Sequence, residues 1–282
     1  MSVVLEEGCR VSAMREGTPL VSGTLRIWNQ IGRATGAQAI SLRIMEFASG
    51  LSPGIRNEDC DEILYAVDWE QGHHARGRWE RGHPVRTEGS VSTACVSGWV
   101  SVFINGHPYD IYPDTGIYIR PGETFAIDNT GPSSVILISS QCPDPDRNPN
   151  FVEPLTVPPS DATQSEQRPL VRLADRPSLP TADRWYRVLI DEEVGSTQVT
   201  QFLGSIPPGR APDHFHNYEE VLFILKGEGR MWTGETNTPI APGSCIYLPK
   251  GRVHCVENTG KDELRLLGVF YPAGSPSVRY DV

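Results

Sequence analysis

Several features that would assign this sequence to a membrane, secreted or nucleic-acid-binding class are missing from it. No apolar run is long enough to span a membrane, and the first residues, which include Glu6 and Glu7, lack the pattern of a secretory signal. Positive charge is scarce, because 25 basic against 35 acidic side chains give a net charge of −10. No helix-turn-helix pattern or basic arm is present. We therefore expect a cytoplasmic protein with no membrane contact and no nucleic-acid partner.

Paired cysteines are missing as well. The six cysteines are scattered, and none forms a Cys-x-x-Cys pair. This distribution favours reduced thiols over a disulfide framework. A hydrophobic content of 38% with 21% charged residues is typical of a soluble globular protein, and 282 residues are enough for two ordinary domains.

The chain instead contains many short runs that are rich in β-branched and aromatic residues. Glycine and proline turns separate these runs, which is the pattern of an antiparallel barrel or sandwich. We expect an all-β fold with strands at 39–47, 62–67, 99–104, 116–119, 135–138, 185–190, 198–203, 220–225 and 264–271.

Four potential metal ligands lie within a short part of the C-terminal half. His214 and His216 are two residues apart, so on an extended strand both rings project from the same face. Glu220 begins the next predicted strand, and a Pro-x-Gly turn at Pro249 delivers His254 on a further strand. Three imidazoles and one carboxylate can surround one divalent ion.

These residues carry a resemblance to a known family. The spacing Gly-x4-His-x-His-x3-Glu-x6-Gly from Gly209, followed by Gly-x5-Pro-x-Gly-x2-His-x3-Asn from Gly243, resembles the two-part motif of the cupin superfamily. The first part is one residue shorter than usual before His214. The resemblance implies a jelly-roll type antiparallel β-barrel that binds one divalent metal ion through His214, His216, Glu220 and His254. Fe(II) is the favoured ion, and Mn, Ni, Zn or Cu also suit these ligands.

An internal repeat points to a second barrel of the same kind. Residues 61–65 echo 219–223, and 116–131 echo 245–260. Aligning Glu62 with Glu220 places Arg56 and Glu58 at the positions of the first two histidines, and Phe125 falls at the position of the third. The chain thus resembles the bicupins, in which two cupin domains are fused, and we expect no metal in the first barrel.

The repeat divides the chain into three parts. We expect an N-terminal barrel at 1–142, with a polar, His- and Arg-rich insertion at about 68–98. A proline-rich linker follows at 143–184, where proline density disfavours helix and central strand. The metal-binding barrel occupies 185–282. A homodimer is a further expectation, because barrel sheets leave exposed edges.

Three functions are compatible with such a metal site. The first is an Fe(II)-dependent oxygenase or dioxygenase that acts on a small organic substrate chelating through oxygen atoms. The alternative is non-redox lyase, isomerase or hydrolase chemistry, of the decarboxylase or aminohydrolase type. The third is a small-molecule-binding cupin without turnover.

Four further side chains on predicted strands of the second barrel are candidates for the substrate pocket. They are Arg187, Gln201, Tyr247 and Arg265, the arginines because they can pair with a carboxylate. Each depends on strand register, since a shift of one residue moves a side chain to the opposite face of the sheet.

Overall fold

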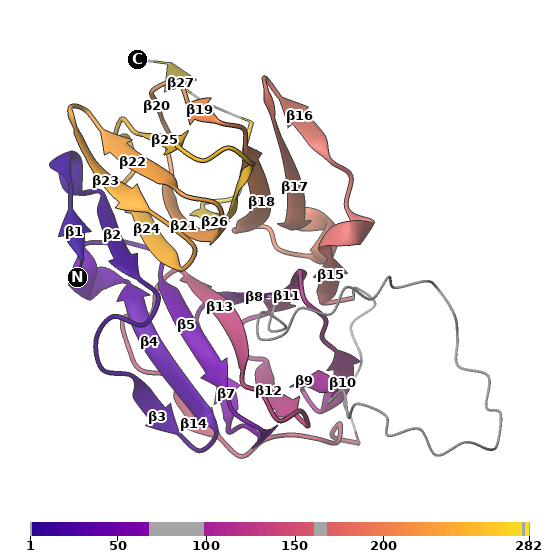
Figure 1. Cartoon of the computed structure of the whole chain (residues 1–282). Coiled ribbons are helices and arrows are strands. Elements are labelled where there is room, and N and C mark those ends of the chain that lie inside the picture. The colour runs from indigo at the N-terminus through magenta and orange to yellow at the C-terminus, as the bar shows by residue number, and fades with distance from the viewer. Residues whose placement is uncertain (1, 68–98, 161–167, 278–279, 282) are drawn as a thin grey trace.

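A computed structural model of the chain describes residues 2–67, 99–160, 168–277 and 280–281 (Figure 1). The predicted insertion at 68–98 lies outside these residues. Within the described part, no helix is long and apolar enough to cross a membrane. Strands dominate, and the helical elements there are short 3-10 turns: η1 (Glu6–Gly8), η2 (Arg33–Thr35), η3 (Leu173–Asp175) and η4 (Glu192–Val194).

The first barrel consists of two antiparallel sheets. The larger sheet has the order β15-β11-β8-β13-β5-β4-β3, and the smaller has β10-β9-β12-β7-β14 with β6 beside β12. The larger sheet contains β3 (Leu20–Ser22), β4 (Leu25–Ile31), β5 (Leu42–Phe47), β8 (Asp61–Ala66), β11 (Thr115–Ile119), β13 (Val135–Cys142) and β15 (Leu170–Arg172). The smaller contains β6 (Gly50–Leu51), β7 (Gly54–Arg56), β9 (Val100–Ile104), β10 (His107–Asp110), β12 (Thr124–Asn129) and β14 (Asn150–Val152).

The second barrel repeats this arrangement. Its larger sheet has the order β1-β2-β24-β21-β26-β18-β17-β16, and two smaller sheets have β19-β25-β22-β23 and β20-β27. The larger sheet contains β1 (Val3–Val4), β2 (Arg10–Ala13), β16 (Leu179–Thr181), β17 (Arg184–Ile190), β18 (Thr200–Ile206), β21 (Glu219–Lys226), β24 (Ser244–Leu248) and β26 (Leu264–Tyr271). The smaller sheets contain β19 (Gly209–Arg210), β20 (His214–Phe215), β22 (Gly229–Thr233), β23 (Thr236–Ile240), β25 (Cys255–Asn258) and β27 (Tyr280–Asp281). The all-β, two-barrel prediction is confirmed.

The large sheets of the two barrels pack against each other. On β21, Leu222 and Ile224 belong to the core of the second barrel, whereas Val221 and Phe223 belong to an apolar cluster shared by both barrels. On β8, Leu64 faces the core of the first barrel while its neighbours join the shared cluster. Because successive strand residues point to opposite faces, β8 and β21 are buried on both sides.

The barrels exchange strands at their edges. β2 lies before the first barrel in sequence but pairs with β24 of the second, with Arg10 opposite Tyr247. β15 lies before the second barrel but pairs with β11 of the first. The expected boundaries at residues 142 and 184 do not include this exchange. Its physical basis is that an edge strand has unpaired backbone groups that any nearby extended segment can satisfy, which composition does not reveal.

The strand pairing also fixes which residues of the two barrels are equivalent. Glu220 lies opposite Leu248, and Glu62 lies opposite Ile119 at the same place in the repeat. The larger sheets can therefore be superposed strand by strand, with β5, β8, β11 and β13 matching β18, β21, β24 and β26.

Candidate metal site

The three predicted histidines come together at the mouth of the second barrel. His214 lies on β20 and His254 immediately precedes β25, and their backbones form a bridge with N–O distances of 3.1 and 2.9 Å. The carbonyl of His216 accepts a hydrogen bond of 2.7 Å from the nitrogen of Gly251, so the glycine turn ties the two ligand segments together. Gly251 has a φ of 75°, which side-chain-bearing residues rarely adopt.

The side chains form a compact donor set. One ring nitrogen from each of His214, His216 and His254 lies within 4.8 Å of the others. Glu220, on the adjacent β21, reaches the set from the side, with Oε2 at 3.5 Å from His216 Nε2. All four side chains line one cavity of about 110 Å³. Glu220 as the fourth ligand stays a prediction, because the close cluster consists of the three imidazoles.

Backbone carbonyls orient two of the rings. The Nδ1–H of His214 donates to the carbonyl of Pro212 at 2.9 Å, and that of His254 donates to the carbonyl of Arg252 at 2.8 Å. A carbonyl can only accept, so each Nδ1 carries the proton and Nε2 is the ring nitrogen that bears the lone pair. Metal-binding histidines are commonly held in this way.

The charges of the site also suit a cation. Burial raises the pKa of Glu220 to about 8. Burial, with the nearby His214 as a further contribution, lowers the pKa of His254 to about 3. The imidazole is therefore neutral and able to donate an electron pair. A bound divalent ion would balance the buried carboxylate, so the residues present fit a metal.

An aromatic column supports one of the ligands. The ring of His216 stacks on Tyr218, with centroids 4.7 Å apart, and Tyr218 stacks on Phe270 at 4.3 Å. Phe270 in turn contacts Phe202, with centroids 5.9 Å apart. The sequence interpretation did not include these residues, and Tyr218 lies in the bend between β20 and β21, where strand periodicity gives no signal.

The four pocket candidates lie elsewhere. The cavity is lined by Tyr186, Phe202, Leu248 and Leu266, each adjacent in sequence to one candidate. The candidates themselves are Arg187, Gln201, Tyr247 and Arg265, and none of them lines the cavity. Successive strand residues point to opposite faces, so each candidate lies on the face of its strand that points away from the cavity. A prediction that is wrong by one residue has this result.

Two of these candidates have clear structural contacts. Gln201 is fully buried between the barrels and donates to the carbonyl of Leu64 at 3.5 Å. Arg187 donates to the carbonyl of Leu173 at 2.9 Å. Both interactions join β17 and β18 to the first barrel or the segment that precedes the second.

A third candidate, Tyr247, belongs to a buried clamp beside the site. Its hydroxyl donates to Glu219, the residue before Glu220. The same carboxylate accepts hydrogen bonds from the backbone nitrogens of Gln38 at 2.8 Å and Ala39 at 2.6 Å, both in the first barrel. The start of β21 is thus fixed by groups from both barrels.

The first barrel places different residues at the equivalent positions. Ile55 pairs with Phe125 as His214 pairs with His254. Counting two residues on from Ile55 gives Asn57 as the counterpart of His216. The earlier alignment through Arg56 and Glu58 was wrong by one residue, because the loop before Glu62 is longer by one than the loop before Glu220.

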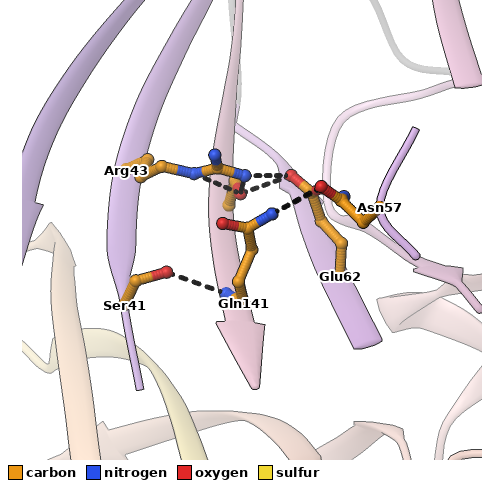
Figure 2. Close-up of polar contacts among 6 residues, drawn as sticks. Ser41, Arg43, Asn57, Glu62 and Gln141 are labelled. Carbon is orange, nitrogen blue, oxygen red and sulfur yellow. Dashed lines mark hydrogen bonds and ion pairs between the residues drawn. The ribbon is translucent and has the colours of Figure 1, made fainter. Parts of the chain in front are cut away.

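Glu62 of the first barrel is the counterpart of Glu220, and its carboxylate is hydrogen-bonded by other side chains of that barrel (Figure 2). It accepts from Arg43 at 2.6 Å, Ser139 at 2.7 Å and Gln141 at 3.4 Å, and also from Asn57. A buried guanidinium from β5 therefore supplies the positive charge, and sequence spacing gave no indication of it. The absence of metal from this barrel stays a prediction.

Comparison with known proteins agrees with this architecture. The family model described as "Cupin domain" matches residues 202–270. Over 83 residues the chain is 35% identical to auxin-binding protein 1 of Arabidopsis thaliana, a match to 26% of this chain and 42% of that protein. It is 32% identical over 87 residues to an uncharacterised Aquifex aeolicus protein, covering 30% of this chain and 70% of that protein.

A third relative is an oxalate-binding protein of Thermotoga maritima, 36% identical over 66 residues, which are 23% of this chain and 54% of that protein. Two of these three matches thus span only about half of the relative's length.

Solved structures match nearly the whole chain. A single-substitution mutant of Bacillus subtilis oxalate decarboxylase superposes with a TM-score of 0.70 at 12% identity, covering 96% of this chain and 79% of that one. A second matched structure of that enzyme, also with a TM-score of 0.70 at 12% identity, belongs to a study of its Mn(II) centres. At this identity the likeness concerns the fold. Together with the family match and the histidine motif, it shows that the chain belongs to the cupin superfamily and has the two-barrel architecture of a bicupin.

Proposed function

We propose that the second barrel is a metal-dependent catalytic centre that acts on a small carboxylate-containing molecule, with lyase chemistry of the decarboxylase type. The observation that carries this proposal is the convergence of His214, His216 and His254 within 4.8 Å, in a cavity that Glu220 also lines. The matched oxalate decarboxylases and the oxalate-binding relative support the substrate class.

Each group of side chains has a definite role in this proposal. The three imidazoles and Glu220 hold the ion. When bound, a divalent ion supplies a Lewis acid that polarises a carboxylate or carbonyl oxygen. The cavity lining is largely apolar, including Phe202, Leu222 and Val256, and it limits the access of water.

Arg184 is our candidate for recognition of the substrate carboxylate. It lines the cavity at the start of β17, and its side chain is 15% exposed. Its present partner, Asp183 at 3.2 Å, is 66% exposed, so a substrate anion can compete for the guanidinium. Replacement of Arg184 by Gln should raise KM for a carboxylate more than it lowers kcat.

The Fe(II) oxygenase and the non-catalytic binding protein are the second and third candidates. The apolar and aromatic lining of the cavity favours an oxygenase, since such a lining suits dioxygen beside an ion. The relatives named for binding auxin and oxalate favour a binding protein.

One experiment separates the three. Metal-free protein is loaded with Mn(II) or Fe(II) and incubated with oxalate and a panel of small carboxylic acids, while carbon dioxide release and oxygen uptake are followed. Substrate loss without net oxygen uptake supports the lyase. Oxygen uptake in proportion to substrate loss supports the oxygenase, and saturable binding of an unaltered molecule supports the binding protein.

A further inference from the structure

A second cavity, separate from the metal site, lies over the polar cluster of the first barrel. It has a volume of about 340 Å³ and lies where β4, β5 and β13 meet the turn at η2. Its lining includes Ser41, Arg43 and Gln141, three of the residues shown in Figure 2. None of the metal-site residues contributes to it.

Arg43 offers unused donors to this cavity. The side chain is only 4% exposed. Its Nε and Nη2 contact Ser139 at 3.3 and 3.0 Å, and Nη2 also contacts Glu62 at 2.6 Å. No residue that the structure describes bonds to Nη1, which Figure 2 draws without a dashed line. Two N–H groups of a buried cation therefore remain for a ligand.

Gln141 offers an acceptor beside them. It is 2% exposed, and its amide Nε2 donates to Asn57 at 2.9 Å and to Glu62 at 3.4 Å. These contacts fix the amide, so Oε1 points away from Glu62. Within the described ranges Oε1 accepts no hydrogen bond. The cavity thus presents fixed donors and a fixed acceptor side by side, which is a requirement for orienting a polar ligand.

The fold itself does not require these polar groups. At the equivalent positions the second barrel has Phe202, paired with Gly268, where the first has Arg43 paired with Ser139. A Cβ atom on Gly268 would lie 2.2 Å from the Phe202 ring, so the glycine is needed for this aromatic packing. The two barrels solve the same packing problem in different ways. At these positions the second barrel has a ring and a glycine, whereas the first has polar side chains.

The rim of the cavity has charged side chains of both signs, including the carboxylates of Asp144 and Asp146. Arg33 is exposed and lines the cavity. Arg147 also lines it and pairs with Asp59 at 2.8 Å. The carboxylate of Asp144 is already engaged by the backbone nitrogens of Arg33 and Asp146, each at 3.1 Å. The buried guanidinium of Arg43, and not a net positive rim, is therefore the group that a negatively charged ligand would contact.

We propose that the first barrel binds a small hydroxycarboxylate in this cavity, with the carboxylate on Nη1 of Arg43 and the hydroxyl donating to Oε1 of Gln141. The carboxylate explains the unused N–H groups, and the hydroxyl explains the acceptor. No chemical step is required, so the first barrel acts as a binding site independent of the function proposed for the second.

The test is a titration of full-length protein with glycolate, acetate and ethylene glycol, followed by NMR. Metal is first removed with a chelator, because carboxylates also bind metal ions. Glycolate should bind more tightly than acetate by about fivefold, the value of one neutral hydrogen bond. Ethylene glycol, which lacks the charge, should bind more weakly still. Equal binding of ethylene glycol and glycolate would overturn the assignment of an anionic ligand.

Two variants locate the site. Arg43→Lys keeps a cation beside Glu62 but lacks Nη1, and it should weaken glycolate binding at least about tenfold, as expected for a charge-assisted bond. Gln141→Met should bring glycolate and acetate to the same affinity. His214→Ala is the matched control in the other barrel and should leave both affinities unchanged. Glycolate binding that survives Arg43→Lys but is lost in His214→Ala would contradict the proposal.

Discussion

The two barrels share a buried glutamate at the same position of the repeat, but they surround it with different partners. It is Glu62 in one and Glu220 in the other, with exposures of 0% and 5%. In the first barrel Arg43 neutralises the charge at 2.6 Å. In the second, the nearest partner is the imidazole of His216. A buried carboxylate is stabilised by a cation. The first barrel supplies a guanidinium from its own sheet, and the proposed function assigns this role in the second barrel to a bound ion.

The interiors differ in the same sense. Met45 of the first barrel is fully buried at the position where the second has Gly204, which lines the cavity. The first barrel fills its interior with apolar side chains and places its cavity beyond the polar cluster. The second keeps its interior partly open beside the histidines. The first barrel therefore lacks the three histidines and also has its interior filled by apolar side chains.

Of the changes that test this difference between the barrels, removal of a histidine should have the largest effect, and the effect should be on metal affinity. His254→Ala should lower metal affinity by more than about 100-fold, because changes to second-shell partners alone cost about 10–100-fold. Metal content after dialysis against a competing chelator measures it. His107→Ala, in the first barrel, removes an imidazole outside the donor set and should leave the metal content unchanged. Full occupancy in His254→Ala would exclude this residue as a ligand.

The cation of the first barrel can be removed in the same way. Arg43→Met should lower the free energy of unfolding by about 3–5 kcal/mol, because it leaves Glu62 buried and unpaired. Urea denaturation measures the loss. The double variant Arg43→Met/Glu62→Met should recover much of it. Arg56→Met, at the exposed pair with Glu58, should change stability little. A loss as small as that of Arg56→Met would show that Glu62 does not depend on the guanidinium.

The pH dependence of stability should reveal the uncompensated carboxylate of the second barrel. Burial raises the pKa of Glu220 from 4.5 to about 8, so folding favours the protonated form. The metal-free protein should be most stable below pH 4.5 with respect to this group and lose stability as pH rises toward 8. Thermal unfolding across this range measures the slope. Glu220→Gln should flatten it, and a slope unchanged by that substitution would assign it to other groups.

The smallest effect should come from the clamp between the barrels. Tyr247→Phe removes the hydroxyl that donates to Glu219, and Tyr118→Phe removes its counterpart, which donates to Asp61 at 2.7 Å. Each should lower the free energy of unfolding by about 1 kcal/mol. Only Tyr247→Phe should also weaken metal binding by a few-fold, because Glu219 precedes Glu220 on β21. Equal metal affinities in the two variants would limit the clamp to a structural role.

Sequence spacing was sufficient for the fold and for the histidines. The two-residue interval between His214 and His216 predicts that both rings lie on one face of an extended segment in any register, so the prediction did not depend on pairing. The pocket candidates did depend on it, and all four were displaced by one residue. Arg43 could not be found by motif, since it comes from a strand distant in sequence and acts only through its contact with Glu62.

The reciprocal pairing of β2 with β24 and of β15 with β11 has a consequence for fragments of this protein. A truncated chain that begins at residue 185 would lack β2, and the backbone groups of β24 would be left open to solvent. Such a fragment is expected to self-associate, because β24 can pair with an extended segment from another molecule. In the intact chain the same geometry would let two copies trade their N-terminal segments, which offers a direct structural route to a domain-swapped dimer.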